Sequence, residues 1–89
     1  MTAEDKILDA GYEDVIIFGN QLGESYDDAL VGISNDGRAI YDFDLMINYL
    51  MRNNDMSCTD AIEWIEYNTI RSLPYAGDKA PIIMYRLDE

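Results

Sequence analysis

The sequence predicts an α+β fold, with a small, mainly antiparallel four-stranded sheet and three helices packed on one of its faces. Three observations lead to this prediction. Two short apolar segments flank an Asp36-Gly37 pair, which is a strong signal for a β-hairpin. Two stretches with apolar residues at helical spacing follow the hairpin, separated by a short polar segment. A last apolar run, residues 81–87, indicates one more strand. The expected order is therefore α-β-β-β-α-α-β.

The N-terminal part is expected to hold one helix and one strand. Residues 2–10 form the helix, because Thr2 can cap its N-terminus and Gly11 suits the end of a helix. The run DVIIF at residues 14–18 is apolar and β-branched, so we expect a strand with both faces covered. Residues 19–25 contain two glycines and no hydrophobic period, which indicates a loop.

The hairpin is the most strongly determined local feature. Residues 28–34 and 39–42 are expected to be its two strands, because an Asp-Gly pair accommodates the positive φ angles of the tight turn at 35–38. The final strand over residues 81–87 is apolar throughout, so we expect it inside the sheet and not at an edge.

The two consecutive helices are expected to be antiparallel neighbours, because only a short loop joins them. The first covers about residues 45–53 and is capped by Asp42 or Asp44. The second begins after Ser57 and ends before Leu73, because a following proline disfavours helical geometry. The second helix has an apolar face and a polar face. The apolar face consists of Ala61, Ile62, Ile65 and Thr69. The polar face consists of Asp60, Glu63, Glu66 and Tyr67.

Composition indicates one folded domain over residues 1–89 in the cytoplasm. Apolar residues make up 48% of the chain and aromatic residues 11%, too many for a disordered protein. No apolar run reaches the ~18–20 residues of a membrane helix, and the N-terminus lacks the pattern of a signal peptide. The single cysteine, Cys58, fits a reducing compartment.

The charge balance limits the class of partner. Eighteen acidic and six basic residues give a net charge of −12, which repels nucleic acid and anionic membranes and attracts basic protein surfaces. The acidity is uneven, with a net charge of −9 over residues 1–44 and −3 over residues 45–89. We therefore expect no direct nucleic-acid binding and no membrane contact. A basic nucleic-acid-binding host protein is the expected partner. Acidity that serves only solubility is the alternative.

Catalytic chemistry finds little support in the sequence. The chain has no histidine and only one cysteine, so the common dyads and zinc clusters are excluded, and it has no phosphate-binding glycine motif. Asp42 and Asp44 are better explained as helix caps than as metal ligands. We expect no enzymatic activity, no cofactor and no bound metal.

Arg71 and three aromatic residues lie in the second helix or just after it. Arg71 stands near a helix C-terminus, where we expect a structural ion pair with Glu63, Glu66 or an acid of the sheet. Trp64, Tyr67 and Tyr75 are expected in the core or at its edge, because small domains use aromatic residues to bury area.

Several segments of the chain resemble a known family. The runs EYNTIR at residues 66–71, LPY at 73–75, APIIMY at 80–85 and DGRAIYDFD at 36–44 are similar to a family of small acidic proteins of unknown function. That family occurs in Firmicutes and in their phages and mobile elements. The resemblance covers nearly the whole chain, with 19–25 as the variable part. It implies a mobile-element setting, in which some proteins inhibit host defence, but it implies no catalytic residues.

The predicted function is a non-catalytic inhibitor of the anti-CRISPR or antirestriction type. Its carboxylates would stand in for phosphates in a basic nucleic-acid-binding cleft. Side chains three residues apart on a helix advance ~4.5 Å along the axis, which is comparable to the ~3.4 Å spacing of charges along one DNA strand. The candidate partner-binding residues are Glu24, Asp27, Asp28, Asp36, Asp60, Glu63, Glu66 and Tyr67.

Two other functions remain open. A small structural or adaptor protein would bind its partner through an apolar patch, at Leu22, Met46, Met51 or the aromatic edge near Tyr75. An enzyme would require a concave pocket with converging polar groups.

Overall fold

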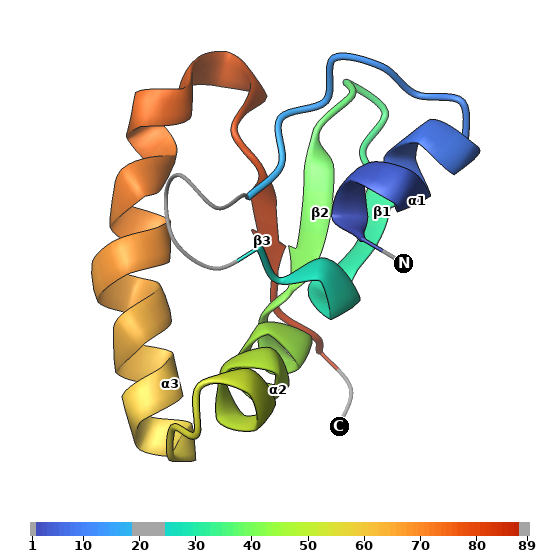
Figure 1. Ribbon diagram of the computed structural model, residues 1–89. Helices are drawn as coiled ribbons and strands as arrows, with labels where there is room; N and C mark the ends of the chain where they lie inside the picture. Colours follow the sequence, from blue (N-terminus) through green and yellow to red (C-terminus); the bar gives the residue numbers. More distant parts are fainter. Residues whose placement is uncertain (1, 19–24, 88–89) are drawn as a thin grey trace.

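The computed structural model of the chain describes residues 2–18 and 25–87 and confirms the α+β class (Figure 1). A three-stranded sheet stands at the centre, with α1 on one side and the long helical column that starts with α3 on the other. The elements in chain order are α1 (Ala3–Asp9), η2 (Asp27–Ala29), β1 (Leu30–Ile33), β2 (Ala39–Asp42), α2 (Phe43–Asn53), α3 (Cys58–Trp64), η3 (Ile65–Thr69), η4 (Ile70–Lys79) and β3 (Ile82–Met84).

The sheet is mixed, so the predicted four strands and mainly antiparallel character are wrong in detail. The strand order is β1-β2-β3. β1 and β2 are the expected antiparallel hairpin, with Ile33 opposite Ala39, whereas β2 and β3 run parallel, with Ile40 opposite Ile82. The chain leaves β2, passes through the helices and returns alongside β2 in the same direction, which is the crossover that parallel pairing requires. β3 consequently lies at an edge of the sheet, not inside it.

The predicted strand at residues 14–18 is an irregular segment instead. Asp14 has a positive φ of 60°. The backbone N–H of Phe18 donates to the hydroxyl of Tyr41 over 3.2 Å, so a side chain, and not a neighbouring strand, binds this group. Ile16 is exposed, and the expectation that both faces are covered is therefore also wrong.

The helix starts and the hairpin turn confirm the predictions from local sequence. Thr2 caps α1 and Ser57 caps α3, each through its side-chain oxygen. Between the two candidate caps of α2, Asp42 is the one used, since its side chain accepts from the N–H of Leu45. In the turn between β1 and β2, Gly37 takes a φ of 85°, as the Asp-Gly signal predicts.

The predicted end of the second helix before Leu73 is wrong, because helical turns of changed geometry continue past Leu73 as far as Gly77, where the backbone is not helical. At η3 the N–H of Ile70 bonds the carbonyl of Ile65, five residues back, which makes a π-helical turn. Pro74 has no N–H to continue an α-helical pattern, and η4 consists of 3₁₀ turns with a kink at Gly77. The proline thus alters the helix without ending it.

The core contains a chain of aromatic rings. Phe18 lies 4.7 Å from Tyr41 and 5.6 Å from Tyr26 between ring centres, and Tyr26 lies 5.6 Å from Tyr49. The tyrosine hydroxyls are hydrogen-bonded: Tyr26 with Thr69 of η3 over 2.7 Å, and Tyr49 with Ser25 over 3.1 Å. These bonds satisfy polar groups that burial removes from water, so the rings anchor segments that lack regular structure.

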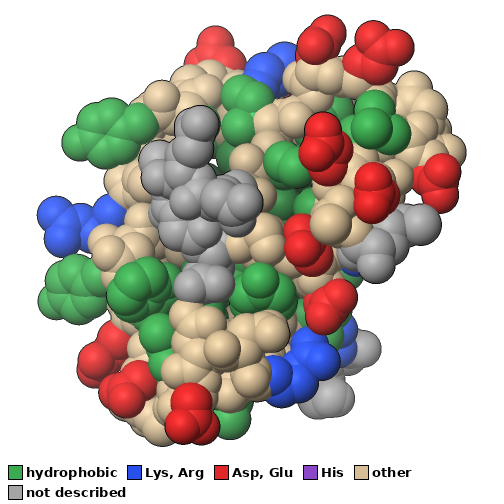
Figure 2. Space-filling model, viewed as in Figure 1, with side chains coloured by type: hydrophobic (Ala, Val, Ile, Leu, Met, Phe, Trp, Pro, Cys, Tyr) green, Lys and Arg blue, Asp and Glu red, His purple; other side chains and the backbone are tan. Residues whose placement is uncertain are grey.

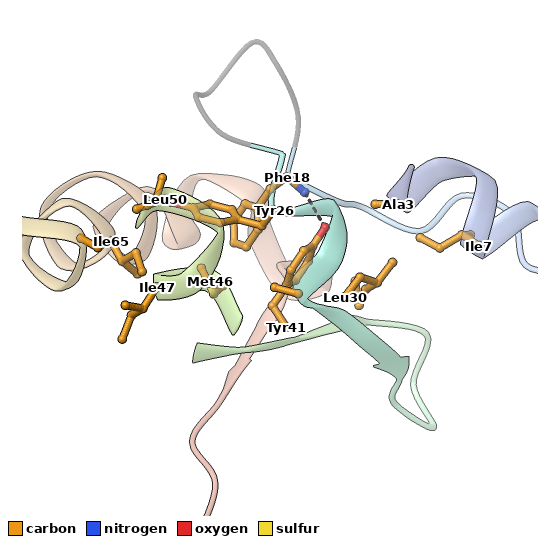
Figure 3. Close-up of a cluster of buried hydrophobic side chains, with 13 residues drawn as sticks. Ala3, Ile7, Phe18, Tyr26, Leu30, Tyr41, Met46, Ile47, Leu50 and Ile65 are labelled. Atoms are coloured by element: carbon orange, nitrogen blue, oxygen red, sulfur yellow. Dashed lines mark hydrogen bonds between the residues drawn. The ribbon is translucent and has the colours of Figure 1, made fainter. Parts of the chain in front are cut away.

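Apolar side chains from the helices and the sheet complete the core (Figure 3). They lie between the sheet and the helices, and they include Ala3 and Ile7 of α1, Leu30 of β1, Met46, Ile47 and Leu50 of α2, and Ala61 and Ile65 of the column. Among the residues described, no helix has both the length and the apolar character that crossing a membrane requires.

Asp42 connects three elements through one buried carboxylate, of which only 1% is exposed. Its Oδ1 accepts from the N–H of Leu45 at the start of α2 over 3.2 Å. Its Oδ2 accepts from Nε of Arg86, just after β3, over 2.5 Å. Both oxygens are therefore bound, which compensates for the loss of water around a buried charge.

We predict that Asp42→Ala lowers the free energy of unfolding by about 2–3 kcal/mol, because it removes both the cap of α2 and the partner of Arg86. Asp44→Ala is the matched control, since Asp44 is the exposed neighbour in the first turn of α2. It should change the free energy of unfolding by less than ~0.5 kcal/mol. Urea unfolding measures both variants, and equal losses would contradict the assignment of Asp42 as the cap.

We also predict a loss of stability in alkaline solution that depends on Tyr41. Burial raises the pKa of Tyr41 from 10.0 to about 12. The folded state holds this proton more tightly than the unfolded chain does. The protonated hydroxyl therefore contributes fully to the free energy of unfolding below pH 10, and this contribution is lost as the pH rises toward 12. Urea unfolding of wild type and Tyr41→Phe should show a stability difference that shrinks over this range. A constant difference would refute the prediction.

Candidate functional site

Asp27 and Asp28, two of the predicted partner-binding residues, are engaged within the chain. Oδ1 of Asp27 accepts from the N–H of Ala3 over 2.9 Å, and the carbonyl oxygen of Asp27 accepts from Nζ of Lys6 over 2.7 Å. Asp27 therefore holds α1 in place. Asp28 forms an exposed ion pair with Arg52 of α2 over 3.2 Å.

Asp36 forms hydrogen bonds within and around the hairpin turn. Its carboxylate accepts a hydrogen bond from the hydroxyl of Ser34, and its carbonyl oxygen accepts from Nζ of Lys79. The bond from Ser34 lowers the pKa of Asp36, with smaller contributions from the charges of Lys79 and Arg38. This carboxylate stabilises its own turn. Glu24, also predicted to bind a partner, lies outside the described residues.

The acidic residues of the column differ from Asp27, Asp28 and Asp36 in their hydrogen bonding and ion pairing. Asp60 and Glu63 on α3 and Glu66 on η3 are all exposed. Within residues 2–18 and 25–87, their carboxylates form no ion pair and no side-chain hydrogen bond, whereas the carboxylates of Asp27, Asp28 and Asp36 each have a partner. The structure thus separates the predicted set into carboxylates that have a partner within the chain and carboxylates that have none among the described residues.

A shallow hollow on the outer side of the column combines two of these carboxylates with aromatic rings. Its volume is about 330 Å³. In Figure 2 acidic side chains gather at the lower left, over α3, and hydrophobic side chains lie directly above them. The hollow is lined by Met56, Asp60, Glu63, Trp64, Tyr67 and Asn68. Glu66 is not part of this lining, so the structure brings Asp60, Glu63 and Tyr67 together and leaves Glu66 outside.

The rings of the hollow differ in how firmly they are held. Trp64 is half-buried and packs against the core, whereas Tyr67 is 68% exposed. The guanidinium carbon of Arg71 lies 5.8 Å from the centre of the Tyr67 ring, a cation–π contact. Among the described residues Arg71 has no ion pair, so the predicted pairing with an acid of the helix or sheet is wrong. Tyr67 and Tyr75 are both expected in the core or at its edge, and their exposure, 92% for Tyr75, corrects this expectation.

This arrangement is suited to a cationic side chain. Aromatic faces carry negative partial charge, and Trp64 and Tyr67 provide them beside two carboxylates. Lysine or arginine from another molecule can bury its alkyl stem against Met56 and place its charge near Asp60 and Glu63. Met56 and Asn68 also line the hollow, although neither is among the partner-binding residues predicted from the sequence. Asn68 stands four residues after Trp64 within the helical column, and this spacing is the signal for a shared face. Met56 precedes the cap Ser57, so it lies outside the helix and no helical spacing points to it.

Other features of the molecule give less support to a site. Among the described residues, no three side chains of His, Cys, Asp or Glu come together to hold a metal ion. Met46, one of the predicted apolar contact residues, is buried in the core, which corrects that expectation. Met51 is exposed, and Leu22 lies outside the described residues.

Comparison with known proteins adds no further constraint, because no protein-family model, curated protein or solved structure matches the chain. The candidate site therefore rests on its geometry.

We predict that the two classes of carboxylate differ in their effect on stability. Asp27→Ala should lower the free energy of unfolding by about 1 kcal/mol, because the N–H of Ala3 loses its acceptor. Asp60→Asn and Glu63→Gln should stay within ~0.5 kcal/mol of wild type, since these carboxylates have no partner among the described residues. Thermal or urea unfolding distinguishes the two, and a large loss on Glu63→Gln would show that this carboxylate is structural.

Proposed function

We propose that this protein is a non-catalytic binding protein that uses the outer side of α3 to hold a basic surface of a nucleic-acid-binding protein. The observation that carries the proposal is the hollow beside Trp64 and Tyr67, with the uncommitted carboxylates of Asp60 and Glu63 at its rim. Exposed carboxylates that lack an internal partner lose nothing within the chain when they pair with a cation from another molecule.

The mechanism is competition with nucleic acid. Carboxylates on α3 take the place of phosphates and pair with lysine and arginine side chains of the partner. Asp60 and Glu63 are three residues apart in a regular helix, so they advance by ~4.5 Å, a step comparable to the spacing of phosphates. The net charge of −12 attracts a basic surface and repels nucleic acid itself.

The biological setting is part of the same proposal. The resemblance at residues 66–71 and 73–75 falls on η3 and η4, which continue the column that carries the hollow. An inhibitor of the anti-CRISPR or antirestriction type, acting in the cytoplasm, is consistent with a small acidic chain of this kind. The host protein that it would bind is identified by chemistry alone, as a basic nucleic-acid-binding protein.

An adaptor protein that binds through apolar contacts is the second candidate. The observation in its favour is the near-complete exposure of Tyr75, together with the exposed Met51. In this case the acidity serves solubility, and changes of charge on α3 would leave partner binding intact.

We predict that Asp60→Lys, Glu63→Lys and Glu66→Lys together abolish binding to the partner. The tagged full-length chain is used to capture proteins from a lysate of the organism that encodes it, at low and high salt. A captured nucleic-acid-binding protein is then purified, and the wild-type chain should displace nucleic acid from it in a fluorescence-anisotropy titration. The triple variant should fail in both steps, because it replaces attraction by repulsion.

The matched control carries Glu4→Lys, Asp9→Lys and Glu13→Lys, which change the net charge by the same amount at exposed positions near α1. It should bind the partner far better than the α3 variant does. Equal losses in the two variants would show that total charge, and not the α3 face, determines binding. If both variants still capture the partner, and do so at high salt, the result would favour the adaptor.

A further inference from the structure

The outer side of the column changes its charge along its length. Glu63 stands four residues before Tyr67 and Arg71 four residues after it. The three lie on one side, because Glu63 and Tyr67 line the same hollow and the Arg71 guanidinium lies against the Tyr67 ring. Along the left edge of Figure 2, acidic, hydrophobic and basic side chains follow one another upward. We call Asp60, Glu63, Tyr67 and Arg71 the α3 strip.

The two ends of the α3 strip cannot neutralise each other within one chain. Glu63 and Arg71 are eight residues apart, with the π-helical turn of η3 between them. Tyr67 lies between them, and Arg71 rests on its ring. Within the described residues, neither Glu63 nor Arg71 has an ion-pair partner. The strip therefore presents an unpaired acidic end and an unpaired basic end, separated by an exposed aromatic ring.

Such a strip is complementary to itself in the antiparallel direction. A two-fold axis near Tyr67 brings Arg71 of each copy opposite Glu63 of the other, because the two residues are equally far from Tyr67 in sequence. The two Tyr67 rings then meet at the centre. We propose that two copies of this chain associate through their α3 strips, and that the hollow of each copy receives Arg71 of the other.

The association is weak. Contact along one helical column should bury less than the ~1,200 Å² typical of stable interfaces, so we expect dimers only at high protein concentration. It does not depend on the proposed nucleic-acid-binding partner. If that partner also uses the hollow, the two contacts exclude each other, and only the monomer binds the partner.

Salt should affect the association in two opposing ways. Each copy carries a net charge of −12 spread over a molecule of 35 × 29 × 26 Å, so much of the repulsion acts over long distances. At ~0.1 M salt the screening length is ~10 Å, which suppresses this repulsion but leaves close ion pairs. At ~1 M it is ~3 Å, and the pairs are screened too. Association should therefore be strongest at intermediate salt.

The test is sedimentation equilibrium of the purified full chain over a range of concentrations at intermediate salt. Wild type should show a monomer–dimer equilibrium. Glu63→Arg and Arg71→Glu should each weaken it by roughly tenfold or more, because each converts two symmetric attractions into repulsions. The double variant, Glu63→Arg with Arg71→Glu, has the wild-type net charge and restores the complementary pairs, so dimerisation should return.

Arg52→Glu is the matched control for Arg71→Glu, since it makes the same change of net charge at an exposed residue of α2. It should leave dimerisation close to that of wild type. A chain that stays monomeric at all concentrations and salt levels overturns the proposal. A dimer that withstands both single changes, or that the double variant does not restore, assigns the contact to another surface and also overturns it.

Cross-linking gives a second measurement that is independent of charge. In a Cys58→Ser background, Tyr67→Cys should form a disulfide-linked dimer under mild oxidation, because the two-fold axis brings these positions together. Val31→Cys, at an exposed residue of β1, is the control and should remain largely monomeric. Faster cross-linking at position 31 than at position 67 would contradict the antiparallel arrangement.

Discussion

The buried carboxylate of Asp42 is the interaction on which the arrangement of the sheet and helices depends. It ends β2, caps α2 and pairs with Arg86 beyond β3. One oxygen directs the chain out of the sheet into the helices, and the other secures the segment that follows the parallel strand on its return. A charge in this position is stable only when both oxygens are bound. Asp42 therefore lies at the start of the crossover from β2 to β3, and through Arg86 it also holds the segment that follows β3.

Tyrosine hydroxyls perform a related task for the irregular segments. Tyr41 of β2 holds the backbone at Phe18, and Tyr26 holds Thr69 in the π-helical turn of η3. Each ring contributes buried apolar area, and each hydroxyl satisfies a polar group that the fold removes from water. Segments without regular hydrogen bonding can therefore join a compact core. Thr69 is buried together with Ala61 and Ile65, so this side of the column faces inward and Tyr67 and Arg71 lie outside.

The acidic residues divide according to whether the fold uses them. Asp27, Asp36 and Asp42 bind backbone or side-chain groups of their own chain. Asp60 and Glu63 border the aromatic hollow, and their carboxylates have no partner in the part of the chain that the structure describes. Total charge alone does not distinguish these two roles, because both kinds of residue contribute equally to it. The proposed binding of a basic partner and the proposed self-association use the same uncommitted groups. They differ in whether the cation comes from another protein or from Arg71 of a second copy.

The sequence by itself determined the caps at Thr2 and Ser57 and the hairpin turn at Gly37, because the groups involved lie within a few residues along the chain. It also determined the outward face of α3, because the polar residues recur at helical spacing. Only the tertiary structure decided the parallel pairing of β3, the irregular course of residues 14–18 and the continuation of the column past Pro74. It also decided which carboxylates are free. Asp27 and Asp42 find partners 24 and 44 residues away, and no local pattern encodes such contacts.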